Sequence, residues 1–260
     1  MSLVWDPAQY QRFGDHRGRP FLDLVGRIGA DGPRRVVDLG CGPGNLTALL
    51  ARRWPQARIE GVDSSPEMIA TAAADPVAAG VDFRVGDITA WTPEPDVDVV
   101  VSNAALQWVP SHRELISRWC NDLRPGSWLA FQVPGNFGAP SHALMRELAA
   151  EPRWAGALAG VLRHDGVVDD PAGYARLLTA RGWVADAWET TYLHRLTGPD
   201  PVLEWVRGTG LRPALQALDP AGAAEFEAEY AARLRVAYPA EPDGSTLFGF
   251  RRVFVVGNRV

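Results

Sequence analysis

Several residue types are missing from this 260-residue chain or scarce in it. It contains no lysine, so all 26 of its Lys+Arg residues are arginine. Arginine therefore also fills the surface positions that lysine usually takes, and a single arginine is a weaker indication of bidentate anion recognition than usual. The two cysteines, Cys41 and Cys120, belong to no Cys-x-x-Cys pair. We therefore predict neither a disulfide framework nor a zinc site.

Long apolar runs and an excess of positive charge are also absent. No run of about 18 apolar residues predicts a membrane span, and the N-terminus lacks the basic-then-apolar pattern of a secretion signal. The net charge of −5 disfavours non-specific nucleic-acid binding. We expect a cytoplasmic protein whose partners include neither a membrane nor a nucleic acid, and the sequence specifies no oligomeric state.

No recognisable set of catalytic side chains occurs. The sequence has neither a Gly-x-Ser-x-Gly elbow nor a His-x-x-x-His pair. The five histidines are scattered and none lies in a recognisable pairing: His16, His112, His142, His164 and His194. We therefore assign no general base and no metal ligand.

The most informative stretch that is present reads Arg35-Val-Val-Asp-Leu-Gly-Cys-Gly-Pro-Gly-Asn45. Residues 36–39 predict a buried strand, and residues 45–54 resume with apolar positions at helical spacing. The glycines between them form a turn without side chains, which lets a ligand approach the backbone. The helix that follows presents free N–H groups at its start. Strand, glycine turn and helix are typical of the first unit of a nucleotide-binding α/β fold.

Strand and helix patterns alternate along the rest of the chain. We predict strands at 36–39, 58–62, 81–85, 97–101, 128–133, 183–196 and 250–256, and helices at 21–28, 45–54, from 67, 111–123, 141–150, 171–180 and 200–237. This order predicts an α/β fold with a doubly wound, mostly parallel seven-stranded sheet and an antiparallel last strand. We expect a single domain over 1–260, with an N-terminal arm or lid at 1–20 and a helical cap at 198–248 between the last two strands.

The glycine spacing distinguishes this turn from a dinucleotide-binding one. The pattern Gly40-x-Gly42-x-Gly44, preceded by Asp38, differs from Gly-x-Gly-x-x-Gly. It resembles motif I of the class I S-adenosylmethionine-dependent methyltransferases, which have a Rossmann-like sheet. The resemblance implies S-adenosylmethionine as cofactor, S-adenosylhomocysteine as product and no metal. It implies that the cofactor contacts Asp38, Gly40, Cys41, Gly42, Asn45, Asp63, Ser64, Met68, Asp87, Ile88, Asn103 and Ala104.

Within that set, three positions have implied roles. Asp63 ends the second strand, 19 residues after Gly44, where a carboxylate can accept hydrogen bonds from both ribose hydroxyls. Asp87 fits the position beside the adenine, and the loop at Asn103 lines the methionine end. The alternatives are a helix-start residue for Asp63 and a turn residue for Asp87.

Four further segments, 103–110, 132–136, 204–213 and 250–254, resemble those of the class I methyltransferases that act on trans-aconitate. The resemblance implies methyl transfer to a carboxylate of trans-aconitate or a similar small polycarboxylate. A carboxylate is ionised at pH 7 and needs no base, so proximity and alignment can drive the reaction. We predict that the acceptor contacts Tyr10, Gln107, Trp108, Gln132, Trp205, Arg207, Arg212, Arg251 and Arg252. Solvated charges are the alternative for the arginines, and ordinary packing is the alternative for the tryptophans.

Two other functions remain open at this stage. The chain could be a methyltransferase for another small acid, hydroxyl or amine, and the last two acceptors would usually need a base. It could also be a non-catalytic cofactor-binding module, because a fold alone does not specify an activity.

Overall fold

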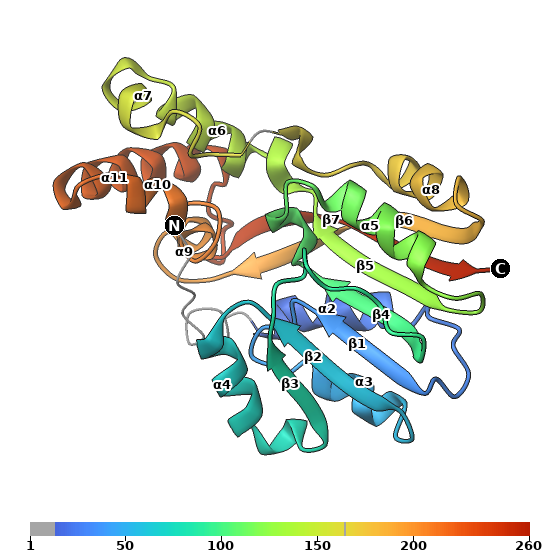
Figure 1. The fold of residues 1–260 in the computed structure, drawn as a ribbon. Coiled ribbons are helices and arrows are strands. Elements are labelled where there is room, and N and C mark those ends of the chain that lie inside the picture. The colour runs from blue at the N-terminus through green and yellow to red at the C-terminus, as the bar shows by residue number, and fades with distance from the viewer. Residues whose placement is uncertain (1–13, 164) are drawn as a thin grey trace. The chain divides into compact units, whose positions relative to one another are not determined.

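The computed structural model describes residues 14–163 and 165–260, drawn as a ribbon in Figure 1. The chain divides into two compact units. Unit 1 contains the residues up to Val133 together with Asp169–Glu189 and Val253–Val260, and unit 2 contains Pro134–Val168 and Thr190–Arg252. Residues 1–13 of the expected arm lie outside the described residues, whereas residues 14–20 begin helix α2 (Gly14–Val25).

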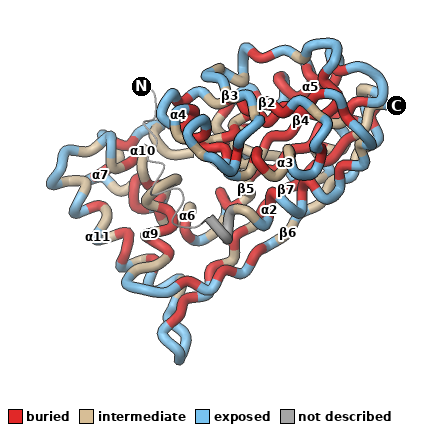
Figure 2. Tube along the Cα trace, turned by 90° about the horizontal axis from the view of Figure 1, so that it is seen from below, coloured by how far each residue is buried: buried red, intermediate tan, exposed pale blue. Residues whose placement is uncertain are grey.

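Five parallel strands form the sheet of unit 1: β1 (Arg35–Leu39), β2 (Arg58–Asp63), β3 (Val81–Val85), β4 (Val97–Asn103) and β5 (Trp128–Pro134). β1 pairs with β2 and β4, β2 pairs with β3, and β4 pairs with β5. β1 is buried along its whole length and β4 up to its last residue, and Figure 2 shows buried residues in red around the label of β4. Such continuous burial is typical of parallel strands with both faces covered.

Two long strands complete the sheet. They are β6 (Trp183–Leu196) and β7 (Thr246–Arg259), and the strand order is β3-β2-β1-β4-β5-β7-β6. β7 runs antiparallel to β5, because Arg259 bonds to Ser127 before β5 and Arg251 bonds to Gly135 after it. The predicted doubly wound, mostly parallel seven-stranded sheet with an antiparallel last strand is confirmed.

The crossovers of unit 1 place helices on both faces of its sheet. The chain steps from β1 through α3 (Thr47–Arg53) to β2 in one direction, and from β4 through α5 (His112–Asp122) to β5 in the other. Because parallel crossovers are right-handed, these two helices cover opposite faces. α5 contacts α8 (Pro171–Thr179), and α4 (Pro66–Ala74) packs against β2 and β3.

Helix α4 begins as the sequence predicts. Ser65 caps it by accepting the Met68 N–H at 3.2 Å, and Pro66 occupies the first helical position. Short 3₁₀ helices η1 (Pro76–Ala78) and η2 (Leu106–Trp108) lie in the loops before β3 and after β4. Within the described residues, no helix is both long enough and apolar enough to cross a membrane.

Unit 2 is mainly helical. It contains η3 (Asn136–Gly138), α6 (Pro140–Ala149), α7 (Pro152–Leu158), η4 (Asp165–Val167), α9 (Pro201–Arg207), α10 (Arg212–Ala217) and α11 (Pro220–Ala237). The helical stretch expected at 200–237 is therefore three helices. Gly208 and Gly210 disfavour helix between α9 and α10, and Pro220 fits only the first turn of a helix, where it starts α11.

Candidate active site

Hydrogen bonds tie together the loops that follow β1 and β2 in unit 1. The Asp63 carboxylate ends β2 and accepts the Gly42 N–H at 2.9 Å through one oxygen and the Ser65 N–H at 2.9 Å through the other. Asp63 is half-buried. A carboxylate has about four lone-pair sites, so each oxygen retains acceptor capacity for a further donor. Asp63 therefore fixes the glycine turn while remaining able to bind a ligand.

The glycines of the turn have different surroundings. Gly40 has φ +82°, and a Cβ there would overlap the Cβ of Ala105, so the loops after β1 and β4 touch. Gly44 has φ +79°, and a Cβ there would lie 2.6 Å from the ring of Phe83. Gly42 also has a positive φ, +55°, but a Cβ there would meet no atom within 4 Å. Gly40 and Gly44 are thus required for packing, whereas Gly42 faces open space.

Asp38 lies beneath this turn and is 2% exposed. Burial raises the pKa of its carboxyl to about 7, a hydrogen bond from Thr47 opposes that rise, and the charge of Asp63 adds to it. The Thr47 hydroxyl donates to Asp38 at 2.6 Å. Cys41 is buried nearby, and burial raises the pKa of its thiol, which is therefore uncharged near neutral pH. Sequence reasoning missed Thr47, although a hydroxyl in the first turn of the next helix was a visible signal.

The loops after β3, β4 and β5 join the same rim. The Gly86 N–H donates to the Asp63 carbonyl at 2.9 Å, and the Ala104 N–H donates to the Gln132 carbonyl at 2.9 Å. Gln107 Nε2 donates to the Ala104 carbonyl at 2.6 Å. Ala104 itself has φ +56°, which is unusual for a residue other than glycine and common near functional sites. The carboxyl ends of five strands are therefore connected by hydrogen bonds or by packing.

Two side chains on this rim have acceptor oxygens without hydrogen bonds. The Asn103 Oδ1 is buried and has no partner among the described residues. Asp87 is exposed, and one of its oxygens accepts the Thr89 N–H at 2.8 Å, as expected of a turn residue. The structure gives no hydrogen bond to its other oxygen within the described part of the chain. Both side chains can therefore accept a hydrogen bond from a ligand.

The remaining predicted cofactor residues differ in exposure. Asn45 and Ser64 are exposed, Ile88 is half-buried and Met68 is buried in α4. The roles assigned to them stay predictions. Among the acceptor residues predicted in unit 1, Gln107 and Gln132 are buried and Trp108 is half-buried in η2. Tyr10 lies outside the described residues.

The acceptor residues predicted in unit 2 have unequal surroundings. Arg207 pairs with Glu204 at 2.5 Å and with Glu227 at 2.6 Å. Arg212 is half-buried and has neither a hydrogen bond nor an ion pair among the described residues. The charge of Arg207 is thus already neutralised, whereas Arg212 can pair with an anion.

Arg251, Arg252 and Trp205 complete the predicted set. Arg251 donates its backbone N–H to Asn136 Oδ1 at 2.6 Å and a side-chain N–H to the Gly135 carbonyl at 3.2 Å. Arg252 is buried with its guanidinium 4.7 Å from the Phe250 ring centroid. Trp205 is 2% exposed and stacks on His194 at 4.7 Å. The contacts predicted for Trp205, Arg251 and Arg252 with the acceptor stay predictions.

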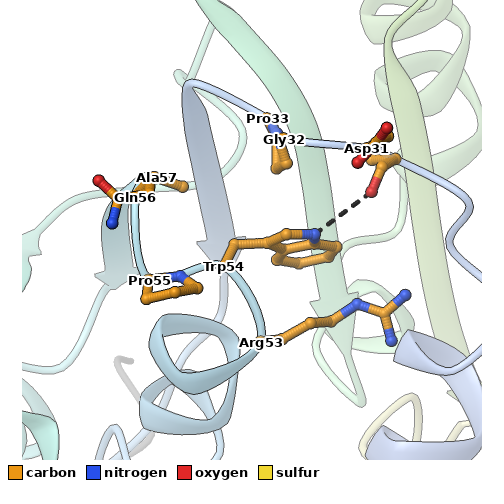
Figure 3. Close-up of a pocket in the computed structure, with 9 residues that line it drawn as sticks. Asp31, Gly32, Pro33, Arg53, Trp54, Pro55, Gln56 and Ala57 are labelled. Atoms are coloured by element: carbon orange, nitrogen blue, oxygen red, sulfur yellow. Dashed lines mark hydrogen bonds between the residues drawn. The ribbon is translucent and has the colours of Figure 1, made fainter.

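A separate hollow of about 440 Å³ is lined by residues 30–33 and 53–57, which Figure 3 draws as sticks. These residues precede β1 and β2, so the hollow lies at the amino ends of the strands. The Trp54 indole donates to the Ala30 carbonyl at 3.3 Å, and the Arg53 guanidinium lies 4.7 Å from the Trp54 ring centroid. Ligands of doubly wound sheets bind beyond the carboxyl ends instead, and no predicted site residue lines this hollow.

The rim of unit 1 fits a nucleoside-like ligand. It offers a carboxylate for hydroxyl groups at Asp63, a free carboxylate oxygen at Asp87, a buried acceptor at Asn103 and a side-chain-free approach at Gly42. Within residues 14–163 and 165–260, no group of three or more His, Cys, Asp or Glu side chains could hold a metal ion.

Comparisons with known proteins agree with this geometry. A family model described as a methyltransferase domain matches residues 36–126. Trans-aconitate 2-methyltransferase from Rhodococcus jostii is 58% identical over 254 residues, which cover 97% of this chain and 98% of the relative. The enzyme of the same name from Streptomyces avermitilis is 57% identical over 261 residues, which cover 98% of this chain and 97% of the relative.

Solved structures share the fold at low identity. The YcgJ protein of Bacillus subtilis has a TM-score of 0.59 at 14% identity, covering 93% of this chain and 98% of that one. Phosphoethanolamine N-methyltransferase 2 of Haemonchus contortus, solved with S-adenosyl-L-methionine, has a TM-score of 0.56 at 17% identity, covering 98% of this chain and 57% of that one.

Proposed function

The chain belongs to the trans-aconitate 2-methyltransferase family, and we propose that it methylates a carboxylate of trans-aconitate with S-adenosylmethionine. The products are a monomethyl ester and S-adenosylhomocysteine. The observation that carries this proposal is the extent of the similarity. It runs through unit 2 as well as through the matched methyltransferase domain, so it includes the part of the chain where the sequence predicts acceptor arginines.

The reaction places few chemical demands on the side chains. S-adenosylmethionine supplies an electrophilic methyl group, which forms a bond to a carboxylate oxygen as its bond to sulfur breaks. The acceptor is ionised at pH 7, so no proton has to be removed. The residues of the chain therefore have to bind, orient and exclude water, and alignment of this kind lowers a barrier by up to about 7–11 kcal/mol.

The residues of unit 1 fit the methyl donor. Asp63 would accept both ribose hydroxyls through lone pairs that the Gly42 and Ser65 N–H groups leave available. The free oxygen of Asp87 would accept the adenine amine. Asn103 Oδ1, which has no hydrogen bond, would accept the ammonium group of the methionine end. Gly42 would let the donor approach the backbone.

In unit 2, Arg212 fits an acceptor-binding role better than Arg207 does. Arg212 has no carboxylate partner among the described residues, whereas Glu204 and Glu227 already occupy Arg207. We therefore expect Arg207 to stabilise α9 against α11, and Arg212 to attract the polycarboxylate. The absence of membrane and nucleic-acid partners and the cytoplasmic location stay predictions.

Ester formation tests the proposal directly. Incubation of the purified chain with S-adenosylmethionine and trans-aconitate is expected to give a monomethyl ester and an equal amount of S-adenosylhomocysteine, detected by mass spectrometry. Reactions without trans-aconitate are the control for spontaneous donor breakdown. A folded protein that binds S-adenosylhomocysteine but forms no ester would contradict the assigned acceptor.

Replacing Gly42 with alanine tests whether the open space beside the glycine turn holds the methyl donor. Gly42→Ala is expected to weaken S-adenosylhomocysteine binding by at least about tenfold, because the new methyl group occupies the space that the ligand needs. Calorimetric titration gives the dissociation constant.

Gly32→Ala is the matched control for this variant. Gly32 has φ +56° and no atom within 4 Å of a Cβ, so it matches Gly42 in conformation and in space. It lies in the turn before β1, at the amino ends of the strands. Both variants carry similar backbone strain, of about 1 kcal/mol. Equal affinity in the two variants would remove Gly42 from the binding site.

A further inference from the structure

Acids neutralise five arginines of unit 2. Arg153 pairs with Glu225 and Glu229, Arg195 with Asp243, Arg207 with Glu204 and Glu227, Arg233 with Glu151 and Arg235 with Asp200. Arg146, on α6, is different. It donates to the Phe137 carbonyl at 2.6 Å and to the Arg163 carbonyl at 3.5 Å, and no carboxylate among the described residues pairs with it. These carbonyls orient the guanidinium without neutralising its charge.

His142 lies one turn before Arg146 on the same face of α6, because residues four apart on a helix are neighbours. Burial and, to a smaller extent, the charge of Arg146 lower the pKa of His142 to about 4, so the imidazole is neutral at pH 7. Its Nδ1 is 3.1 Å from the Ser141 hydroxyl. When that hydroxyl donates to Nδ1, the ring proton lies on Nε2, which can donate to an anion.

The segment that carries Arg212 packs against this histidine. A Cβ on Gly210 would lie 3.2 Å from His142 Nε2, so Gly210 packs close to that nitrogen and the lack of a side chain there keeps it from being covered. Arg212 follows two residues later, at the start of α10. His142 therefore lies between the segments that carry Arg146 and Arg212. Neither arginine has a carboxylate partner among the described residues.

A buried side-chain amide lies in η3, the 3₁₀ helix just before α6. Asn136 is 2% exposed, and its Oδ1 accepts the Arg251 N–H at 2.6 Å. Its Nδ2 has no hydrogen-bond partner among the described residues. Buried polar groups almost always have a partner, and the exceptions call for an explanation such as a ligand. Asn136 directly precedes Phe137, whose carbonyl holds Arg146.

We propose that Arg146 and His142 on α6, with Asn136 on the adjacent η3, bind a carboxylate of the acceptor acid other than the one that is methylated. This inference rests on the proposed function and names a specificity site for it, which we call the α6 anchor. One Nη1 hydrogen of Arg146 is held by Phe137, and the rest of the guanidinium can bind a carboxylate through two parallel hydrogen bonds. Binding at a non-reacting carboxylate adds affinity for the acid equally in the ground state and in the transition state.

Replacing Arg146 with glutamine tests the α6 anchor. Arg146→Gln is expected to raise the KM for trans-aconitate, and the dissociation constant of trans-aconitate from the S-adenosylhomocysteine complex, by about 10- to 100-fold. The kcat and the affinity for S-adenosylhomocysteine are expected to stay within about threefold of the original values, since neither depends on this arginine. Arg146→Lys is expected to recover only part of the affinity, because an ammonium cannot form the two-pronged contact.

Arg153→Gln is the matched control, because it removes one positive charge from the same unit at a residue that Glu225 and Glu229 neutralise. It is expected to leave both constants unchanged. If Arg146→Gln does not fold, as judged by thermal unfolding and S-adenosylhomocysteine binding, His142→Ala is measured in the same way. For that variant we expect a rise of about 3- to 10-fold in both constants, because it loses a neutral donor.

The outcomes separate this inference from the proposed function. If the unaltered chain forms the ester and Arg146→Gln keeps its KM, the α6 anchor is wrong and the function stands. If the unaltered chain forms no ester but binds trans-aconitate in an Arg146-dependent way, the function is wrong and the anchor stands. If the unaltered chain neither binds trans-aconitate nor esterifies it, both are overturned.

Discussion

Asp38→Asn is expected to gain about 3 kcal/mol of folding stability, relative to the original ligand-free chain, when the pH rises from about 4.5 to about 8. Burial raises the pKa of Asp38 to about 7 in the folded chain, against a weaker lowering by Thr47. In the unfolded chain the pKa is about 3.9. Between these two values the folded chain binds more protons than the unfolded one, so the contribution of Asp38 to stability falls as pH rises. Asparagine does not titrate, so the variant does not lose this stability as the pH rises.

Urea unfolding at the two pH values measures the effect, with the free energy extrapolated to water for both proteins. Asp98→Asn is a matched control from the neighbouring strand β4. Burial alone would raise the pKa of Asp98, but hydrogen bonds from Arg34 and Arg124 outweigh burial and hold it at about 2. Asp98 is therefore ionised throughout the window, and its replacement is expected to cost the same at both pH values. A constant difference for Asp38→Asn would show that its carboxyl ionises at an ordinary pH.

A buried carboxylate at this position suits the charge of the proposed ligand. S-adenosylmethionine carries a sulfonium and an ammonium group, and positive charge near a carboxylate favours its ionised form. Asp38 lies under the turn that Asp63 holds, so both acids belong to the rim that we assign to the methyl donor. Burial of Asp38 thus destabilises the ligand-free protein near neutral pH, and binding of a cationic ligand is expected to offset this cost.

The part of the fold that sequence could predict is local or follows from a general rule. Residues 36–39 and 97–101 are strand-like because valine and leucine fill all but one position of each, and the structure buries them in β1 and β4. Ser65 starts α4 through its own side chain, three residues from the N–H that it caps. The meeting of Asp63, Asp87 and Asn103 on one rim follows because parallel strands end at the same edge of a sheet.

Contacts between distant residues could not be predicted in this way. Asn136 and Arg251 are 115 residues apart, and Arg207 and Glu227 are 20 residues apart on different helices. No periodicity connects such pairs. Sequence reasoning therefore included Arg207 among the acceptor residues without its glutamate partners, and it did not select Arg146, whose distinguishing feature is the absence of a carboxylate partner in the described structure.

Asp63→Ala is expected to weaken S-adenosylhomocysteine binding by about 10- to 150-fold, or about 1.5–3 kcal/mol. The loss has two sources: the ribose hydroxyls lose their acceptor, and the Gly42 and Ser65 N–H groups lose the carboxylate that fixes the turn. Asp63→Asn is expected to lose less, because its one carbonyl oxygen can still accept one of these N–H groups. Asp75→Ala is the matched control, since Asp75 accepts the Val77 N–H at 2.9 Å just after α4, away from the rim. If calorimetry gives Asp63→Ala and Asp75→Ala the same affinity for S-adenosylhomocysteine, Asp63 and the glycine turn do not bind the methyl donor.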